Sequence, residues 1–129
     1  MIVVDSSVWI DFFNGVSTAE VERLDGLLGV TPVAIGDLIL VEVVQGFRLD
    51  KDVAMVRQLF RSLAPLPILG ARNAWKAAEN YRELRRRSIT VRKTIDGIIA
   101  TACIAANLPL LFSDRDFLPY VEHLGLEAA

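Results

Sequence analysis

The chain has 129 residues, of which 53% are apolar, and its mean hydropathy is +0.40. Its 14 Lys and Arg residues face 16 Asp and Glu residues, so the formal net charge of −2 provides no overall attraction to nucleic acid. A single cysteine (Cys103) and a single histidine (His123) exclude a disulfide framework, a Cys-based zinc site and His-rich zinc catalysis. We expect one domain spanning residues 1–129, a cytoplasmic location and no membrane segment, with the apolar surplus buried in a core and in a protein–protein interface.

Short apolar strands alternate with helices along the chain. In the first half of the chain, the pattern predicts a strand over 2–4, a helix from the cap Ser6 to Phe13, a helix from Thr18 to Gly29, a strand over 31–35 and a helix from Asp37 to about Phe47. A helix over 50–63, stopped by Pro65, and a strand over 66–69 follow. In the second half, the pattern predicts helices over 71–87 and 94–107, a strand over 109–113, a helical segment over 114–123 and a short final strand over 124–126. This alternation is typical of an α/β domain with a short, mostly parallel central sheet and helices on both faces.

Four acidic residues interrupt or directly follow apolar runs where a buried apolar residue would be expected. Asp5 follows the strand at 2–4, and Asp114 follows the run that ends at Ser113. Glu42 and Asp96 each lie within a run of apolar helical residues. Burial of an ionised carboxylate is costly unless a cation compensates it, and no Lys or Arg lies inside these runs. The pattern therefore indicates that the four carboxylates share a divalent cation.

The expected positions of these acids support a common site. Asp5 and Asp114 each follow a strand, so a parallel sheet would place both at its carboxyl edge, where open α/β folds bind ligands. Glu42 and Asp96 are expected to face inward or into a cleft. Oxygen ligands without His or Cys suit Mg²⁺ or Mn²⁺, which can activate water for phosphodiester hydrolysis. The sequence leaves open whether one or two metal ions bind.

Each acid also has an ordinary structural interpretation. Asp5 can cap the helix that follows it, and Asp96 can stabilise the first turn of its helix through the helix dipole. Asp114 and Asp116 can play the same two roles, and Glu42 can be a solvated helix residue. The occurrence of all four acids next to or inside apolar runs favours one shared metal site over four separate structural roles.

The context of the acids resembles the four motifs of PIN-domain ribonucleases. The similar segments are residues 4–11, 40–46, 91–100 and 112–117, of which the third and fourth are the most specific. The spacing and the chain length are similar to those of the single-domain VapC toxins of bacterial toxin–antitoxin pairs. The resemblance spans the whole chain and implies a PIN fold and Mg²⁺- or Mn²⁺-dependent endoribonuclease activity. It also implies a homodimer, inhibition by a cognate VapB-type antitoxin, and contact with DNA only through that antitoxin.

The resemblance also suggests roles for the acids. Asp5 and Asp96 are expected to ligate the metal most directly. Glu42 would bind through water or orient the attacking water, and Asp114 would act as an outer or second-metal ligand. These four form the expected catalytic set. Asp116 is a further candidate metal ligand, because the fourth motif contains two aspartates and only one of them need face the site.

Four other residues are candidates for supporting roles. Ser7 is expected to donate a hydrogen bond to Asp5 and fix its rotamer. Arg87, Arg92 and Lys93 belong to the most basic stretch of the chain, directly before Asp96, and are candidate RNA contacts. The same stretch is explained equally well as a solvated helix end, where the arginines interact favourably with the C-terminal end of the helix dipole.

Two other classes of protein with acidic phosphate-handling sites fit the sequence less well than a nuclease. An aspartyl-phosphate phosphatase needs a second aspartate two residues after the first, but position 7 is Ser. A receiver domain needs a Lys after a late strand, and residues 110–116 contain none. The remaining alternative is a non-catalytic PIN-like scaffold whose role is to bind a partner.

Overall fold

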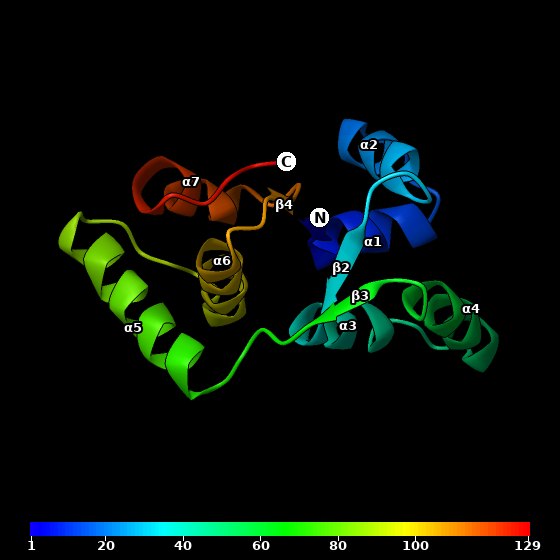
Figure 1. Ribbon diagram of the computed structural model, residues 1–129, viewed down its shortest axis with the longest axis horizontal. Helices are drawn as coiled ribbons and strands as arrows, with labels where there is room; N and C mark the ends of the chain where they lie inside the picture. The colour runs from blue at the N-terminus through cyan, green and yellow to red at the C-terminus, as the bar shows by residue number, and fades with distance from the viewer.

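A computed structural model describes all 129 residues, and its centre is a four-stranded parallel sheet (Figure 1). The strands are β1 (Ile2–Val4), β2 (Val33–Gly36), β3 (Ala64–Leu66) and β4 (Leu110–Leu111), in the spatial order β3-β2-β1-β4. β1 pairs with β2 through Ile2 and Val33 and with β4 through Val3 and Leu110. All strands therefore end at the same edge, as the sequence predicted.

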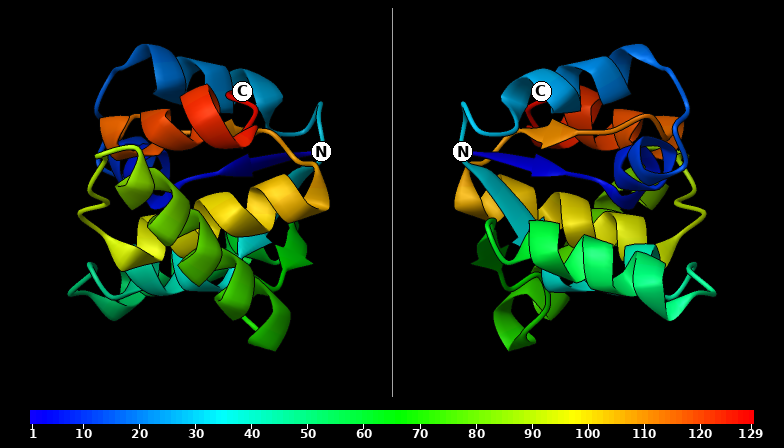
Figure 2. Two further views of the ribbon diagram at one scale, coloured as in Figure 1. Left: turned by 90° about the vertical axis from the view of Figure 1, so that its left-hand side faces the viewer. Right: turned by 90° about the vertical axis from the view of Figure 1, so that its right-hand side faces the viewer.

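Helices cover both faces of this sheet. They are α1 (Ser6–Phe13), α2 (Ala19–Leu27), α3 (Asp37–Val44), α4 (Asp50–Phe60), α5 (Ala71–Arg86), α6 (Thr94–Ala106) and α7 (Leu118–Leu124), with a 3-10 turn η1 (Arg115–Phe117). In Figure 1, α5, α6 and α7 lie on one side and α1, α2 and α4 on the other. Figure 2 shows α5 crossing over α6 when this first side faces the viewer. The predicted α/β class is confirmed. None of the helices has the length and apolar character needed to cross a bilayer.

The apolar residues form one cluster of 24 buried side chains. The strands are short, and β1 and β4 are wholly buried, so they contribute only apolar residues to this cluster. Trp9 of α1 is fully buried against the rings of Phe13 and Phe60, at centroid distances of 5.8 and 5.0 Å. This aromatic contact joins α1 to α4. By contrast, Trp75 on α5 is 76% exposed and lies outside the core.

Two predicted strands differ from the structure. Pro65 does not precede a strand over 66–69 but lies inside β3, at the edge of the sheet, where a residue without an N–H group is tolerated. The predicted final strand over 124–126 is wrong. Leu124 ends α7, Gly125 takes a left-handed conformation (φ 84°), and only one isolated bridge pairs Ala128 with Leu110. The closing segment is thus too short to form a ladder.

Candidate metal centre

The acidic residues converge at the carboxyl edge of the sheet. The Asp5 backbone N–H, directly after β1, donates to the Leu111 carbonyl of β4 at 2.9 Å. The N–H of Ser113 donates to Ser7 Oγ at 3.4 Å and fixes the start of the fourth acidic motif beside α1. Segments from opposite ends of the chain are therefore held together where the parallel strands end.

Asp5 uses its two carboxylate oxygens differently. Its Oδ2 accepts from the backbone N–H of Ser7 at 3.1 Å and from Ser7 Oγ at 2.7 Å, so Asp5 is the N-cap of α1. The sequence-based assignment of the cap to Ser6 was therefore wrong, whereas the expected contact of Ser7 with Asp5 is present. Asp5 Oδ1 is buried and has no hydrogen-bond partner. Capping and metal binding are thus compatible, since one oxygen caps and the other remains free.

Asp96 is the most perturbed carboxyl group of the cluster. It lies in the first turn of α6 and is 5% exposed, and its Oδ2 is buried without a hydrogen-bond partner. Desolvation, followed by the negative charge of Asp5, raises the pKa of Asp96 to about 7, against a partial opposing effect of Lys93. Desolvation also raises the pKa of Asp5 despite its bonds to Ser7. The raised pKa values show that ionisation of these two buried carboxyl groups is unfavourable without a compensating charge. A divalent cation bound between them would supply that charge.

Both aspartates of the fourth motif face this centre. Asp96, Asp114 and Asp116 each offer a carboxylate oxygen, and these three atoms lie within 4.8 Å of one another. Asp114 Oδ1 accepts from the Asp116 N–H at 2.9 Å and caps the turn η1, which leaves Oδ2 directed to the cluster. The sequence left open which of the two aspartates faces the site, and the structure brings in both.

Lys93 occupies the space between these carboxylates. Its Nζ donates to Asp114 Oδ2 at 2.6 Å and lies 3.9 Å from oxygens of both Asp96 and Asp116. Partial desolvation raises the pKa of Asp114, but the Lys93 hydrogen bond, the Asp116 N–H and the Lys93 charge outweigh it, so this pKa lies below its usual value. Hydrogen bonding to Asp114 in turn raises the pKa of Lys93. The expectation that no basic residue compensates the acids was therefore incomplete.

Glu42 lies at the rim of the centre on α3. It is half-buried, and Ser6 Oγ donates to its Oε1 at 3.1 Å. Desolvation is the largest influence on Glu42 and, with the charge of Asp5, raises its pKa against the effect of the Ser6 bond. The Asp-Ser-Ser sequence after β1 thus supplies one carboxylate and two hydroxyl groups, each of which fixes a different acid.

The donor set fits a divalent metal ion. Asp5 Oδ1 and Asp96 Oδ2 are buried, anionic when ionised, and accept no hydrogen bond, and oxygen donors are the ligands that Mg²⁺ and Mn²⁺ prefer. Asp114 and Asp116 bring oxygens within 4.8 Å of Asp96, whereas Asp5 and Glu42 lie outside this group of three. Lys93 is 57% exposed on its side chain, so a metal can displace its ammonium group at little cost.

The three basic candidates differ in their availability. Arg87 forms an ion pair with Glu83, at 3.2 Å from its Nε, and approaches His123 Nδ1 at 3.5 Å. Arg92 is exposed and forms no ion pair. Lys93 contacts the acids themselves. Of the three, Arg92 is the cation that is free to meet a phosphate beside the centre.

The sequence analysis named Lys93 only as a candidate RNA contact and missed its contact with the acids, and it missed the roles of Ser6 and Tyr120. Lys93 stands three residues before Asp96 at a helix start, a spacing that places both side chains near one turn. The role of Ser6 followed from no pattern, because Glu42 is 36 residues away. Tyr120 of α7 is 1% exposed, and its hydroxyl lies over Gly97, next to Asp96. Burial, with the charges of Asp96 and Tyr81, raises the pKa of Tyr120 to about 12, so the hydroxyl remains a neutral donor.

Comparison with known proteins identifies relatives of this chain. The chain is 28% identical over 131 residues to VapC ribonuclease Mb1587 of Mycobacterium bovis and to ribonuclease VapC11 of Mycobacterium tuberculosis, and the match covers 100% of this chain and 98% of each relative. These names agree with the VapC type that the motifs resemble.

Solved structures share the fold. VapBC2 from Rickettsia felis, bound to a DNA fragment from its promoter, superimposes with a TM-score of 0.79 at 17% identity and covers 100% of this chain and 98% of the other. VapBC-1 from nontypeable Haemophilus influenzae gives 0.75 at 15% identity and covers 100% and 97%. The family model described as PIN domain matches residues 2–121. The chain therefore belongs to the PIN domain family.

Proposed function

We propose that this protein is a Mg²⁺- or Mn²⁺-dependent endoribonuclease that acts as the toxin of a type II toxin–antitoxin pair. The observation that carries this proposal is the presence of two buried carboxylate oxygens that accept no hydrogen bond, Asp5 Oδ1 and Asp96 Oδ2, at the carboxyl edge of a parallel sheet. Membership of the PIN domain family and the similarity to ribonucleases named VapC support it.

The chain's own residues have distinct roles in this proposal. Asp5 and Asp96 would hold the metal, and Asp114 and Asp116 would hold the outer side of its shell or a second ion. A metal bound here would lower the pKa of a coordinated water and neutralise charge on the phosphate. Glu42, with its raised pKa and its bond to Ser6, is placed to accept a proton from the attacking water. Lys93 would leave Asp114 and contact the RNA phosphate, as would the unpaired Arg92.

Cleavage of RNA in the presence and absence of the metal tests this assignment. The wild-type protein should cleave RNA in Mg²⁺ or Mn²⁺ and stop when EDTA is added. Asp5→Asn and Asp96→Asn should each lower the rate by several orders of magnitude, since each removes a ligand charge while keeping the shape of the side chain. Asp25→Asn is a matched control, because Asp25 is exposed on α2. Wild-type cleavage in EDTA would contradict the proposal, whereas a protein that binds an antitoxin but never cleaves RNA would favour the non-catalytic scaffold.

The same electrostatics support the proposal that a VapB-type antitoxin inhibits the protein. Lys93 shows that an ammonium group fits between Asp114, Asp96 and Asp116. We propose that an Arg or Lys from a flexible segment of the antitoxin takes this place, with Arg favoured because its planar fork can pair bidentately with a carboxylate. Antitoxin binding should then weaken as Mg²⁺ rises, and an affinity that stays constant across millimolar metal would exclude this mode. DNA would be contacted only through the antitoxin.

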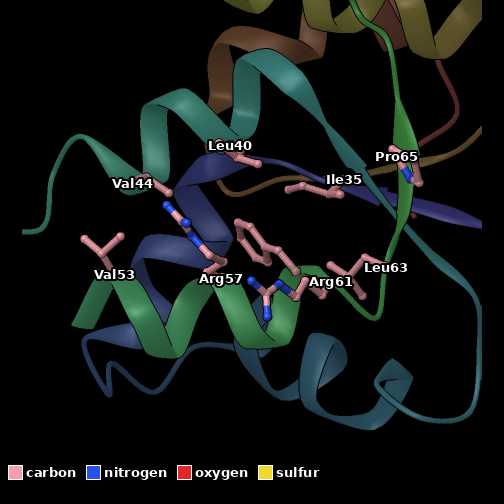
Figure 3. A pocket seen from close by; sticks show the side chains of 9 residues that line it. Ile35, Leu40, Val44, Val53, Arg57, Arg61, Leu63 and Pro65 are labelled. Atoms are coloured by element: carbon pink, nitrogen blue, oxygen red, sulfur yellow. The ribbon is translucent and has the colours of Figure 1, made fainter. Parts of the chain in front are cut away.

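An apolar groove between α3 and α4 is a candidate surface for the antitoxin's helix (Figure 3). Leu40 and Val44 of α3 face Val53 of α4 across a cavity of about 510 Å³. Arg57 and Arg61 of α4 border the groove, and Arg57 extends toward α3. An amphipathic helix with acidic residues beside its apolar face would complement this surface.

Exposed apolar side chains elsewhere support the proposed homodimer. Trp75 is 76% exposed, Val41 52% and Leu69 48%, so all three side chains are accessible to a second copy of the chain. A two-fold pair is the commonest assembly of identical chains, and aromatic residues at its centre contribute most of its affinity. We propose that the protein acts as this homodimer, as a single PIN domain over residues 1–129, in the cytoplasm.

A further inference from the structure

A second cavity lies directly beside the acidic centre, between α5 and α6. Its volume is about 420 Å³, and it is lined by small and apolar side chains together with two tyrosines and two arginines. Thr94, Gly97 and Ile98 of α6 form its floor, so the floor includes the residue that follows Asp96. The two helices that enclose it cross each other closely in Figure 2. A ligand in this cavity would adjoin the acidic centre.

The hydroxyl of a largely buried tyrosine opens into this cavity. Tyr120 of α7 is 1% exposed and lines the cavity, yet its hydroxyl forms no hydrogen bond with the protein. The hydroxyl lies so close to α6 that a Cβ at position 97 would be 2.6 Å from it, and only glycine leaves this space free. The hydroxyl is not among the buried atoms without a partner, so water in the cavity can reach it, and a ligand that displaces this water leaves the hydroxyl unpaired unless it supplies an acceptor. The position is therefore suited to a ligand that presents an acceptor.

The rim of the cavity carries free positive charge and an aromatic face. Arg82 and Arg85 of α5 line the cavity and form no ion pair, although the neighbouring Arg86 and Arg87 both pair with Glu83. The Arg85 guanidinium lies over the ring of Tyr81, 5.6 Å from its centroid. No acidic residue lines the cavity. This chemistry selects an anion that also has a flat apolar part.

We infer that the cavity between α5 and α6 binds one nucleotide of the RNA substrate next to the cleaved bond. The base would enter the cavity and accept a hydrogen bond from the Tyr120 hydroxyl, and the adjoining phosphates would contact Arg82 and Arg85. This combination of an aromatic face, a base-edge contact and arginines is how proteins hold single-stranded RNA. The inference rests on the proposed function and extends it, because it names a part of the protein that would set the base preferred beside the scissile phosphate.

Binding of a short, fluorescein-labelled, single-stranded RNA of randomised sequence tests the inference. Fluorescence anisotropy is measured on the Asp96→Asn background, so that cleavage does not interfere. Ala78→Leu adds bulk at the cavity wall and should weaken binding about tenfold. Arg82→Ala should weaken it too and should reduce the slope of log affinity against log salt by about 0.7. Ala54→Leu on α4 and Arg86→Ala on α5 are matched controls that should leave binding unchanged, because neither residue lines the cavity.

The base preference of cleavage provides a second measurement. A purely structural role of Tyr120 would leave this preference unchanged. In the otherwise wild-type protein with Mg²⁺, Tyr120→Phe removes only the hydroxyl and should relax the base preference at one position beside the cleaved bond. RNA binding that is the same in Ala78→Leu and Arg82→Ala as in the controls overturns the inference. So does a change in the sedimentation of the Ala78→Leu protein with unaltered RNA binding, since the cavity would then serve a protein contact. Absence of metal-dependent cleavage by the wild type counts against the proposed function alone, because the binding measurement does not depend on cleavage.

Discussion

The stability of the metal-free protein should depend on pH through Asp96. Its folded-state pKa is about 7, while its ordinary value is 3.8. Between these values the folded state holds a proton that the unfolded state has released, so the free energy of unfolding falls as pH rises through this window and levels off above it. The raised pKa of Asp96 therefore costs the metal-free protein up to roughly 2 kcal/mol at pH 5, where the folded state keeps the proton, and up to roughly 4 kcal/mol at pH 8, where Asp96 is ionised.

Replacement of Asp96 by Asn removes this cost, because the amide stays neutral at both values of pH. Urea or thermal unfolding in EDTA should show a more stable Asp96→Asn protein, and the gain should grow by roughly 2–3 kcal/mol between pH 5 and pH 8. That growth corresponds to roughly 8 °C in the melting temperature for a domain of this size. The exposed Asp25→Asn serves as the control and should show no such growth. If Asp96→Asn is instead destabilised at pH 8, the favourable interaction of the carboxylate with the N-terminus of α6 outweighs its desolvation, and the electrostatic reasoning is refuted.

Three further outcomes follow from other contacts. Lys93→Met removes the ammonium group bound to Asp114 and should tighten Mn²⁺ binding measured by calorimetry, whereas an unchanged affinity would mean that Lys93 does not compete with the metal. Gly97→Ala places a methyl group 2.6 Å from the Tyr120 hydroxyl and should lower the free energy of unfolding by about 1–3 kcal/mol. Tyr120→Phe in the same chain should restore part of this loss, because it removes the hydroxyl. An equal loss in the double variant would point to another cause. Trp75→Ala should convert the proposed dimer to a monomer in sedimentation experiments without lowering the helix content, and a persistent dimer would place the interface elsewhere.

Much of the architecture could be read from local patterns. β1 and the helices that follow it are set by β-branched runs, caps such as Thr18 and apolar helical spacing, and these appear where expected. Pro65 misled the prediction, because a proline both stops helices and fits the edge of a sheet. Which of these applies depends on the neighbouring strand, and the sequence does not state that Ile35 pairs with Pro65.

The acids of the site were visible because each one breaks an apolar run. The role of each carboxylate oxygen could not be predicted from the sequence. Asp5 caps a helix with one oxygen and leaves the other free, and no spacing rule distinguishes two oxygens of one side chain. The partners Ser6 and Tyr120 depend on contacts between distant segments, as does the placement of Lys93 against Asp114. Tertiary packing decides such contacts, and it leaves no periodic trace in the sequence.

The position of a bound metal tests the central claim most directly. Crystals grown with Mn²⁺ and measured near the manganese absorption edge would show where the ion lies by its anomalous scattering. We expect a peak at about 2.0–2.2 Å from Asp5 Oδ1 and Asp96 Oδ2, with the Lys93 ammonium displaced from Asp114. A peak remote from these two oxygens, or no peak while Lys93 remains bound between the carboxylates at saturating Mn²⁺, would contradict the account.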